Sequence, residues 1–302
     1  MKRVTSLNSI LAFVTVAREG SVSRAAEVLN LTQPAISHQI KRLGEETGVS
    51  FFKRTPHGVE LTRDGAALLP KAESVLSAMA DFRQSASRQI GQVSGALRIG
   101  TIVDPEFIRL GPLLNQLGEA HPGITTELVH GISGEVLEKL RRGQIDAGFY
   151  LTAPEGADAL VSAERMRSRV LVMFNYRIIA PAGWETRVSN ADWRDLARLP
   201  WIGTSAASVH NRLLRKIFSE HGCTQNVVAL VDHEASMLEM VRAGVGLCLC
   251  RESIARAQQI SCGLSICETH SVPASLVMLS AESRSSSPVV AALFKQLNAV
   301  WG

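Results

Sequence analysis

The sequence contains no apolar run that could cross a membrane. A transmembrane helix needs about 18–20 uninterrupted apolar residues, and no stretch of this chain approaches that length. The first twenty residues combine a basic start with an apolar middle, as a signal peptide does. However, Arg18 and Glu19 stand where a small-residue cleavage site would follow. We therefore expect a protein without a membrane partner and without an export signal.

Cysteine is scarce and unevenly placed. The chain has five cysteines, all in its last third: Cys223, Cys248, Cys250, Cys262 and Cys267. An odd number is a poor disulfide framework and fits a reducing compartment better than a secreted setting. The composition therefore predicts a cytoplasmic protein.

Motifs that carry catalytic chemistry are also missing. We find neither a glycine-rich phosphate loop nor a cluster of His, Cys and Asp with the spacing of metal ligands. The stretch WIGTSAA places Ser205 after a strand, but Ala207 replaces the final glycine of a nucleophile elbow. His210 and Asp232 could serve Ser205 only if the fold brought them to it. We therefore predict no enzymatic activity, no catalytic residues, no metal and no resident cofactor.

What is present is a chain long enough for two domains, with its charge concentrated at one end. The 302 residues carry a net charge of +4. Residues 1–90 hold twelve basic and eight acidic side chains, and the remainder is neutral overall. An excess of positive charge on one small domain is typical of a protein that meets a polyanion, although a solvated surface gives the same count.

The N-terminal residues predict three short helices. The first has apolar residues at helical spacing, namely Leu7, Ile10, Leu11, Val14 and Ala17. Gly20 can end it in a left-handed conformation, and Ser21 or Ser23 can cap a second helix. Thr32 is placed to cap a third helix, with Pro34 in its first turn.

The third helix has the composition of a DNA-recognition helix. Ile36, Ile40 and Leu43 form its inward stripe, which leaves polar and basic side chains on the other faces. These are Gln33, Ser37, His38, Lys41 and Arg42. Gln can pair with an adenine edge, and Lys or Arg can reach guanine or phosphate. A solvated helix face is the competing interpretation for any single residue among them.

Residues 49–62, VSFFKRTPHGVELT, predict a strand, a turn and a second strand. The turn falls at Pro56–Gly58, between apolar anchors on either side. Such a hairpin is a wing, and its Lys53, Arg54 and His57 would reach the sugar-phosphate backbone or the minor groove.

Taken together, residues 21–65 resemble the winged helix-turn-helix of LysR-type transcriptional regulators. The matching features hold their spacing over about 45 residues: Ala25-Ala26, Leu29, Thr32-Gln33-Pro34-Ala35-Ile36-Ser37, Leu43, Glu45, Gly48, Phe52-Lys53-Arg54, Leu61-Thr62 and Gly65. The resemblance implies that Gln33, Pro34, Ser37 and His38 approach DNA, with Arg42 nearby and Arg54 on the wing.

Beyond Thr62, a plausible helix cap, the chain predicts a long helix with a heptad seam. Leu68, Ala72, Val75, Met79, Phe82 and Ala86 are spaced alternately by four and three residues. Pro70 interrupts the pattern and invites a kink. The helix could pack on its own domain, but we expect a dimer contact through Leu68, Val75, Met79 and Phe82. LysR-type proteins are similar in dimerising through such a linker helix.

From Ser94 the pattern changes to alternating strands and helices, which predicts parallel sheets with helices on both faces. Strands are expected at 96–101, 124–129 and 146–150, and helices at about 106–120 and 134–142. A second such unit begins near Leu171, the chain returns at about 264–278, and a last helix covers about 288–301.

The expected fold class is α/β overall: a winged helix-turn-helix, a long linker helix and a bilobed α/β effector domain. The last resembles periplasmic solute-binding proteins and the effector domain of the LysR family, with LRIGT, LRRGQIDAGF, IFSEHG and MVRAGVGLCL as landmarks. We expect domain limits at 1–62, 63–92 and 93–302. Lobe I would comprise about 93–165 and 268–302, and lobe II about 166–267.

Ligands of such folds lie where strands end and helix N-termini converge. Here those points predict an effector site formed by Ile102, Val103, Asp104, Ser133, Gly134, Thr204, Ser205 and His210. Several of the hydroxyl residues could simply be helix caps. Asp104, followed by Pro105, is itself a favoured helix start. As a carboxylate in the crevice, it would instead favour an amine or a hydroxyl donor over a carboxylate ligand. Arg251 stands where relatives often have proline, and its role is open.

The sequence therefore predicts a DNA-binding transcriptional regulator controlled by a small-molecule effector of unidentified structure. Its partners would be an interrupted inverted repeat in double-stranded DNA, a second copy in a dimer or tetramer, and RNA polymerase. The effector would shift the orientation of the subunits by binding one state better than the other. The alternative is a cysteine-based redox or metal sensor on the same DNA-binding scaffold, for which Cys262 and Cys267 are the more accessible candidates.

Overall fold

The structure is a computed structural model that describes residues 6–55, 58–87, 93–102 and 104–302. The chain divides into two compact units. One comprises the residues up to Gln92 together with Arg141–Gln144, and the other comprises Val93–Leu140 and Ile145–Gly302. In the described part of the chain, no helix combines the length and the apolar composition that a bilayer crossing requires.

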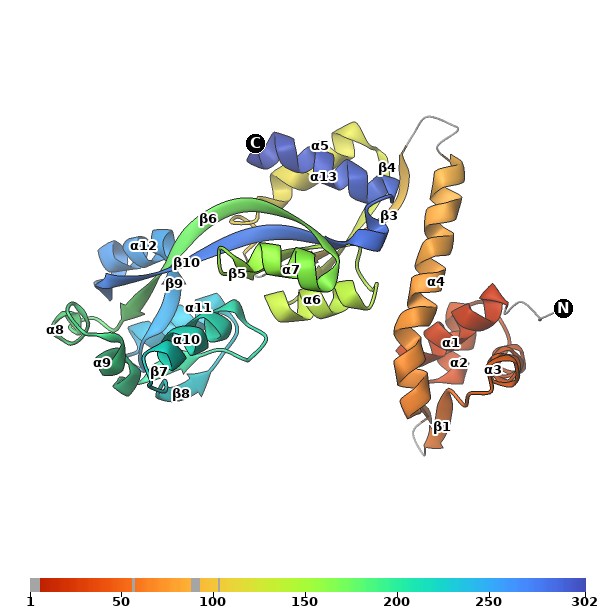
Figure 1. The fold of residues 1–302 in the computed structure, drawn as a ribbon, viewed down its shortest axis with the longest axis horizontal. Coiled ribbons are helices and arrows are strands. Elements are labelled where there is room, and N and C mark those ends of the chain that lie inside the picture. Colours follow the sequence, from red (N-terminus) through yellow and green to blue (C-terminus); the bar gives the residue numbers. More distant parts are fainter. Residues whose placement is uncertain (1–5, 56–57, 88–92, 103) are drawn as a thin grey trace. The chain divides into compact units, whose positions relative to one another are not determined.

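The N-terminal unit contains four helices and one hairpin (Figure 1). Its elements are α1 (Leu7–Glu19), α2 (Val22–Val28), α3 (Gln33–Thr47), β1 (Phe52–Thr55), β2 (Gly58–Leu61) and α4 (Arg63–Ser87). Local chemistry explains the helix limits. Gly20 ends α1 with φ 62°, and the Ser21 hydroxyl accepts the N–H of Arg24 at the start of α2. The Thr32 hydroxyl likewise accepts the N–H of Ala35, as expected from its position before Pro34.

Two small clusters form the core of this unit. In one, α1, α2 and α3 meet at Ala12, Val16, Ala25 and Ile36, where small residues allow close packing. The other joins Phe13 of α1 to Phe51, with ring centroids 4.5 Å apart. Leu68, Leu69, Ala72 and Leu76 of α4 pack against this second cluster. The start of α4 is therefore held on its own domain by apolar contacts.

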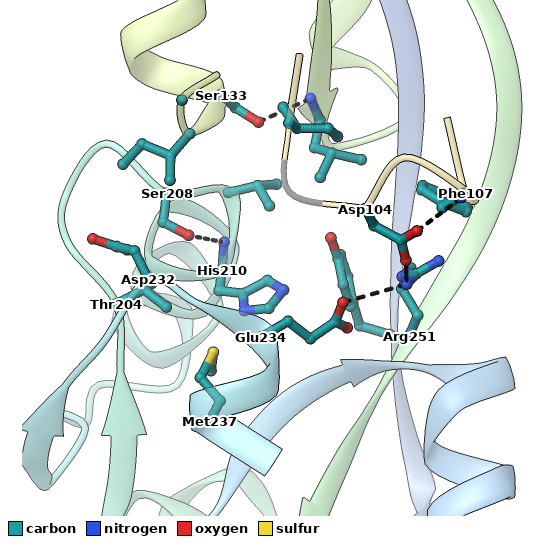
Figure 2. A pocket seen from close by; sticks show the side chains of 16 residues that line it. Asp104, Phe107, Ser133, Thr204, Ser208, His210, Asp232, Glu234, Met237 and Arg251 are labelled. Carbon is teal, nitrogen blue, oxygen red and sulfur yellow. Dashed lines mark hydrogen bonds and ion pairs between the residues drawn. The ribbon is translucent and has the colours of Figure 1, made fainter. Parts of the chain in front are cut away.

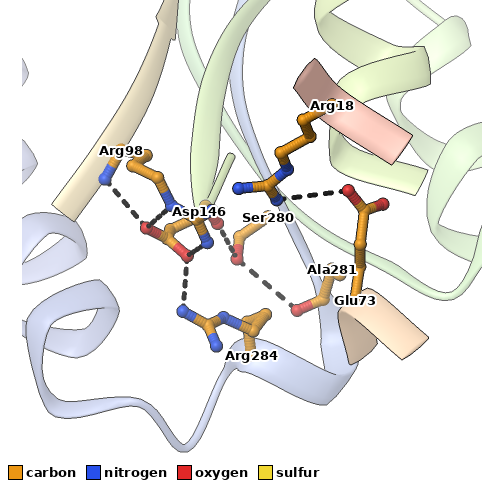
Figure 3. Close-up of polar contacts among 7 residues, drawn as sticks. All are labelled: Arg18, Glu73, Arg98, Asp146, Ser280, Ala281 and Arg284. Atoms are coloured by element: carbon orange, nitrogen blue, oxygen red, sulfur yellow. Dashed lines mark hydrogen bonds and ion pairs between the residues drawn. The ribbon is translucent and has the colours of Figure 1, made fainter. Parts of the chain in front are cut away.

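An ion pair between a half-exposed arginine and a buried glutamate adds to that contact. Glu73 of α4 is 4% exposed and accepts a hydrogen bond of 3.2 Å from the Arg18 guanidinium of α1 (Figure 3). The hydroxyl of Thr62 accepts the N–H of Gly65, so it caps α4 as the sequence predicted. The helix continues through Pro70, and the Ser74 hydroxyl donates to the Pro70 carbonyl.

The C-terminal unit begins with three strands and three helices that form lobe I (Figure 1). They are β3 (Ser94–Thr101), α5 (Leu110–Ala120), β4 (Gly123–His130), α6 (Ser133–Arg141), β5 (Ala147–Thr152) and α7 (Gly156–Glu164). Lobe II and the return to lobe I follow. These elements are β6 (Met166–Ala180), α8 (Glu185–Val188), α9 (Trp193–Arg198), β7 (Trp201–Gly203), α10 (Val209–Glu220), β8 (Val227–Leu230), α11 (Glu234–Arg242), β9 (Cys248–Arg251), α12 (Glu252–Cys262), β10 (Ser265–Ala281), the 3-10 turn η2 (Glu282–Arg284) and α13 (Pro288–Trp301).

The sheets differ from the expected pair of parallel sheets. One six-stranded sheet has the order β4-β3-β5-β10-β6-β9, and β7-β8 forms a short parallel pair. Within the six-stranded sheet, β3 pairs in parallel with β4 and with β5. The other pairings are antiparallel: β10 with β5, β10 with β6, and β6 with β9. The reason is that β6 and β10 run through both lobes and pair with each other from one lobe to the other (Figure 1). The expectation of parallel sheets is confirmed for β3 with β4 and β5 and for β7 with β8, but it was wrong for β6, β9 and β10, because the crossing strands return in opposite directions.

A separate core stabilises each lobe. In lobe I, α5, α6 and α13 pack on the sheet around Leu97, Leu113, Phe149 and Leu293. In lobe II, two clusters surround Trp201 and Ile202. The indole N–H of Trp201 donates to the Leu196 carbonyl over 2.7 Å, which satisfies the polar atom of a fully buried side chain.

Asp146 is a buried charge in lobe I. It is 1% exposed and accepts hydrogen bonds from the Arg98 backbone N–H at 2.8 Å and from the Arg98 guanidinium at 3.0 and 3.2 Å. Arg284 of η2 donates to the same carboxylate (Figure 3). One aspartate therefore connects β3, the start of β5 and the turn after β10.

Candidate functional site

The outer face of α3 is a continuous polar surface. All six α3 residues expected to approach DNA are exposed: Gln33, Pro34, Ser37, His38, Lys41 and Arg42. Ile36 and Leu43 are buried beneath them, at 0% and 3% exposure. The helix is therefore held by its apolar stripe while its polar stripe is free to enter a major groove.

Intramolecular ion pairs restrain the basic residues of this surface. The Arg42 guanidinium lies 2.9 Å from Glu46, and the Lys41 ammonium lies 3.8 Å from Glu45. The Lys41–Glu45 pair is exposed and contributes roughly 0–1 kcal/mol, so a phosphate can replace its carboxylate at little cost. The Glu46 side chain is only 10% exposed, so Arg42 is held more firmly.

The wing places a third basic residue at the surface. Lys53 of β1 is exposed and pairs with Glu60 of β2 over 2.9 Å. Arg54 lies on β1 opposite Val59, but its side chain is outside the described residues, as are Pro56 and His57. The hairpin is anchored to α1 because the N–H of Val59 donates to the Gly20 carbonyl over 3.2 Å.

The residues expected at a dimer contact fall into two groups on α4. Leu68 packs against the core of its own domain. Val75 and Phe82 are exposed, at 42% and 69%, and Met79 is partly buried. The end of α4 therefore carries large apolar side chains that its own described residues leave uncovered.

The C-terminal unit contains a cleft between lobe I and lobe II (Figure 2). Its empty space measures about 640 Å³, part of which is open to solvent. The wall from lobe I includes Ile102, Asp104, Phe107, Ile132, Ser133 and Leu151. The wall from lobe II includes Tyr176, Thr204, Ser208, His210, Asp232, Glu234, Met237 and Arg251.

Five of the eight residues expected to bind an effector line this cleft: Ile102, Asp104, Ser133, Thr204 and His210. Val103 lies outside the described residues. Gly134 and Ser205 are not among the lining residues. The N–H of Gly134 already donates to the Ala207 carbonyl over 2.9 Å, and the Ser133 hydroxyl accepts the N–H of Leu151 over 3.1 Å. Protein groups therefore occupy these two polar positions.

Arg251 and Glu234, which the sequence did not place in the site, form an ion-pair cluster with Asp104 (Figure 2). The Arg251 guanidinium donates to Asp104 of lobe I and, over 3.3 Å, to Glu234 at the start of α11. It also lies over the Phe107 ring, 4.2 Å from its centroid. Asp104 in addition accepts the N–H of Phe107, so it caps the turn after β3 as well as pairing with Arg251. The available sequence signal was a charged residue, Arg251, at the end of a strand of buried residues.

A row of rings lies along the cleft. Phe107 meets Phe174, Phe174 meets Tyr176, and Tyr176 meets His210, each edge to face with centroids 4.6–5.0 Å apart. Burial raises the pKa of the Tyr176 hydroxyl above its usual value. Burial also lowers the pKa of His210 to about 4, although Asp232 acts in the opposite direction. The imidazole of His210 is therefore neutral near pH 7.

Ser205, His210 and Asp232 do not form a catalytic triad in this arrangement. Asp232 accepts the backbone N–H of Ser205 over 3.0 Å. Neither the Ser205 hydroxyl nor His210 Nδ1 has a hydrogen-bond partner among the described residues. A nucleophile needs a base within hydrogen-bond reach, and this serine has none in the described structure.

Two of the cysteines are poorly suited to react. Cys248 and Cys250 of β9 are each 1% exposed, and burial raises the pKa of both thiols, to about 12 for Cys250. Cys267 is also buried, whereas Cys262 is exposed at the end of α12. Among the described residues, no three His, Cys, Asp or Glu side chains are grouped so that they could hold a metal ion.

Two family models match the chain. Residues 91–302 match the one described as LysR substrate binding domain. Residues 7–66 match the one described as bacterial regulatory helix-turn-helix protein, lysR family. The chain is also similar to the RuBisCO operon transcriptional regulator of Acidithiobacillus ferrooxidans, with 28% identity over 274 residues, which are 90% of this chain and 85% of that protein.

Solved structures share the fold. A full-length OxyR variant from Pseudomonas aeruginosa superposes with a TM-score of 0.71 at 20% identity, covering 98% of this chain and 95% of that one. Full-length CbnR in complex with its target DNA gives a TM-score of 0.59 at 19% identity, covering 97% of this chain and 99% of that one. At these identities the likeness concerns the architecture, which extends over both units.

Proposed function

Since the chain belongs to the LysR family of DNA-binding transcriptional regulators, we propose that it binds an interrupted inverted repeat as a dimer and responds to a small molecule held in the cleft between its lobes. The proposal of DNA binding rests on the exposed polar face of α3, which lies above a buried apolar stripe. The proposed domain limits are 1–62, 63–92 and 93–302, and the cytoplasm is the proposed place of action because the DNA partner lies there.

The division of labour on DNA follows from the side chains. Gln33, Ser37 and His38 stand near the N-terminus of α3, where a recognition helix meets base edges. Lys41, Arg42 and Lys53 carry the positive charge that phosphates attract. We therefore assign sequence preference to the first group and salt-dependent affinity to the second.

Self-association is proposed from α4. Val75 and Phe82 expose apolar side chains on a helix with a heptad spacing, and a second copy of the same helix would cover them. A dimer would present two α3 helices to two half-sites. We further propose that two dimers pair into a tetramer and that the DNA-bound protein contacts RNA polymerase.

The cleft is the proposed effector site, without a resident cofactor or metal. Thr204 is 4% exposed, lines the cleft, and has a hydroxyl without a partner among the described residues. An unpaired buried hydroxyl costs about 1–3 kcal/mol, which a ligand with a hydrogen-bonding group would offset. The alternative of a cysteine sensor depended on accessible thiols at Cys262 and Cys267. Cys262 is exposed, but the expectation was wrong for Cys267, which is buried in the lobe II core.

The experiment is recovery of genomic DNA fragments by the purified full-length chain at two salt concentrations. The proposal expects discrete fragments that share an interrupted inverted repeat. Gln33→Ala should abolish their selection, and Arg42→Ala should lower the recovery of DNA, most strongly at the higher salt concentration, where binding is not saturated. Gln259→Ala, at an exposed glutamine of α12, should change neither. Uniform recovery of all sequences, or unchanged selection by Gln33→Ala, would overturn the proposal.

A further inference from the structure

The cleft contains more negative than positive charge. Three carboxylates line it, those of Asp104, Asp232 and Glu234, against a single guanidinium, that of Arg251. His210 contributes no charge near pH 7, because burial lowers its pKa to about 4. The carboxylates are accessible to a ligand, since Asp104 and Glu234 retain 28% and 26% side-chain exposure and Asp232 is exposed.

Arg251 is already committed to partners in the protein. Its side chain is 10% exposed, and its guanidinium donates to Asp104 and Glu234 while it lies over the Phe107 ring. Both hydrogen bonds come from Nη2, so an anionic ligand that approached this guanidinium would also come close to the carboxylates of Asp104 and Glu234. Their negative charge would repel it, so binding of an anion at Arg251 is unfavourable.

Backbone N–H groups at or next to the starts of α6 and α10 are occupied as well. The N–H of Gly134 in α6 donates to the Ala207 carbonyl, and the N–H of His210 in α10 donates to the Ser208 hydroxyl over 3.3 Å. The N–H of Ile132 donates to the Glu135 carboxylate over 3.2 Å. Groups of this kind bind anions when they are free. Here the protein uses them itself.

Two polar atoms remain without a partner among the described residues. The Thr204 hydroxyl oxygen and His210 Nδ1 are both buried atoms on the lobe II wall of the cleft. A hydroxyl can donate or accept a hydrogen bond, and so can an imidazole nitrogen, depending on its tautomer. This observation is independent of the carboxylates and points to a ligand with polar groups, whereas the carboxylates determine its charge.

We propose that the effector is a small molecule bearing a protonated amine, whose ammonium group meets the carboxylate of Glu234 or Asp232 while its other polar groups reach Thr204 and His210. The inference rests on the proposed role of the cleft as the effector site. An ammonium donates up to three hydrogen bonds and carries the charge that this cleft lacks. It would join the cluster without releasing Arg251.

The test uses four probes of the same chain length that differ in charge: 1,4-diaminobutane, 4-aminobutanoate, butane-1,4-diol and succinate. Affinities are measured by calorimetry on the full-length chain at low salt, where charge selectivity is least screened. We expect 1,4-diaminobutane to bind at least about tenfold more tightly than butane-1,4-diol, which corresponds to about 1.4 kcal/mol, and succinate to bind most weakly.

Variants locate the selectivity. Glu234→Gln and Asp232→Asn keep the side-chain shape but remove the negative charge. Each should reduce the preference for the diamine over butane-1,4-diol from about tenfold, or about 1.4 kcal/mol, to below about threefold. Glu239→Gln on the outer face of α11 is the matched control and should retain it, because that carboxylate is 73% exposed and does not line the cleft. Two cleft variants are used so that a folding defect in one does not decide the result.

Tighter binding of succinate than of the diamine overturns the proposal. So does equal binding of all four probes, absence of binding, or a preference that survives in both cleft variants. Retention of a specific DNA fragment by the unliganded chain is measured in parallel. If that retention persists while amine selectivity is absent, the amine inference fails and the regulator proposal stands, whereas loss of both would remove the regulator proposal as well.

Discussion

Gly58, the first residue of β2, lies against the backbone carbonyl of Gly20 at the end of α1. A Cβ atom at residue 58 would lie 2.5 Å from that carbonyl oxygen, and Gly58 has φ 138°, a conformation that L side chains rarely adopt. The next residue, Val59, donates its N–H to the same carbonyl. The wing is therefore fixed to the helical domain through backbone atoms at a position where only glycine fits.

Gly58→Ala should displace the wing. The substitution combines a steric overlap with a strained φ, so we expect a loss of about 1–3 kcal/mol in the free energy of unfolding, together with weaker DNA binding. Amide hydrogen exchange in β1 and β2 would report the change. Gly111→Ala in α5 is the control, since nothing lies within 4 Å of its Cβ, and it should stabilise the chain by up to about 1 kcal/mol. Unchanged exchange in the wing of Gly58→Ala would contradict the role of this contact.

Lys53→Ala should weaken binding equally for all DNA sequences. Removal of one phosphate contact lowers the dependence of log K on log salt by about 0.9, so titrations at several salt concentrations measure the effect. Glu60→Gln should act in the opposite direction, because Glu60 is the ion-pair partner of Lys53. Lys216→Ala, on the exposed pair with Glu155 in the C-terminal unit, provides the control. A loss of sequence preference in Lys53→Ala would instead assign base contacts to the wing.

Asp146→Ala should destabilise lobe I strongly. The substitution leaves the guanidiniums of Arg98 and Arg284 without their shared carboxylate, for which we expect a cost of about 3–5 kcal/mol. Urea denaturation followed by tryptophan fluorescence would measure it. Glu155→Gln, which breaks an exposed pair with Lys216, should cost less than about 1 kcal/mol. Similar losses in the two variants would show that burial of Asp146 does not determine its contribution.

The buried imidazole predicts a pH dependence of stability. The pKa of His210 falls from 6.5 to about 4 because burial disfavours the charged ring. In the unfolded chain the ring takes up a proton below about pH 6.5, whereas in the folded chain it stays neutral down to about pH 4. Stability is therefore full above pH 6.5 and declines as the pH falls through this range, by about 3 kcal/mol at most.

His210→Phe should remove that decline, because phenylalanine keeps a ring beside Tyr176 and has no proton to gain. The comparison is the difference in unfolding free energy between the two proteins at pH 7 and pH 4.5. A constant difference over this interval would mean that His210 titrates normally in the folded chain.

Local chemistry in the sequence predicted the helix limits of the N-terminal unit well. Three capping residues each act within one helical turn, so their effect does not depend on distant residues. They are Thr32 before Pro34, Gly20 after an apolar stripe and Thr62 before a heptad seam. The last helix was predicted for the same reason, since Pro288 begins α13.

Long-range pairing could not be predicted in this way. The long strands β6 and β10 are about 100 residues apart in sequence, and their pairing makes a sheet that is mostly antiparallel in its second half. The helix expected from about Glu106 begins only at Leu110, because Asp104 caps a turn and Arg109 adopts φ 45°. The partners of Arg251 likewise come from segments 17 and 147 residues away, which no local pattern reveals.

The strands β6 and β10 also determine how the two lobes can move. They pair with each other from Ser265 opposite Ala180 to Ala281 opposite Met166, with irregular register at Cys267/Ser271 and at Leu276/Val277. Two hydrogen-bonded strands bend and twist as one ribbon, whereas sliding them past each other would break their bonds. A change in the angle between the lobes would therefore bend or twist this ribbon, most easily at its two irregular positions, and Tyr176 of β6, which lines the cleft, links the ribbon directly to whatever the cleft holds.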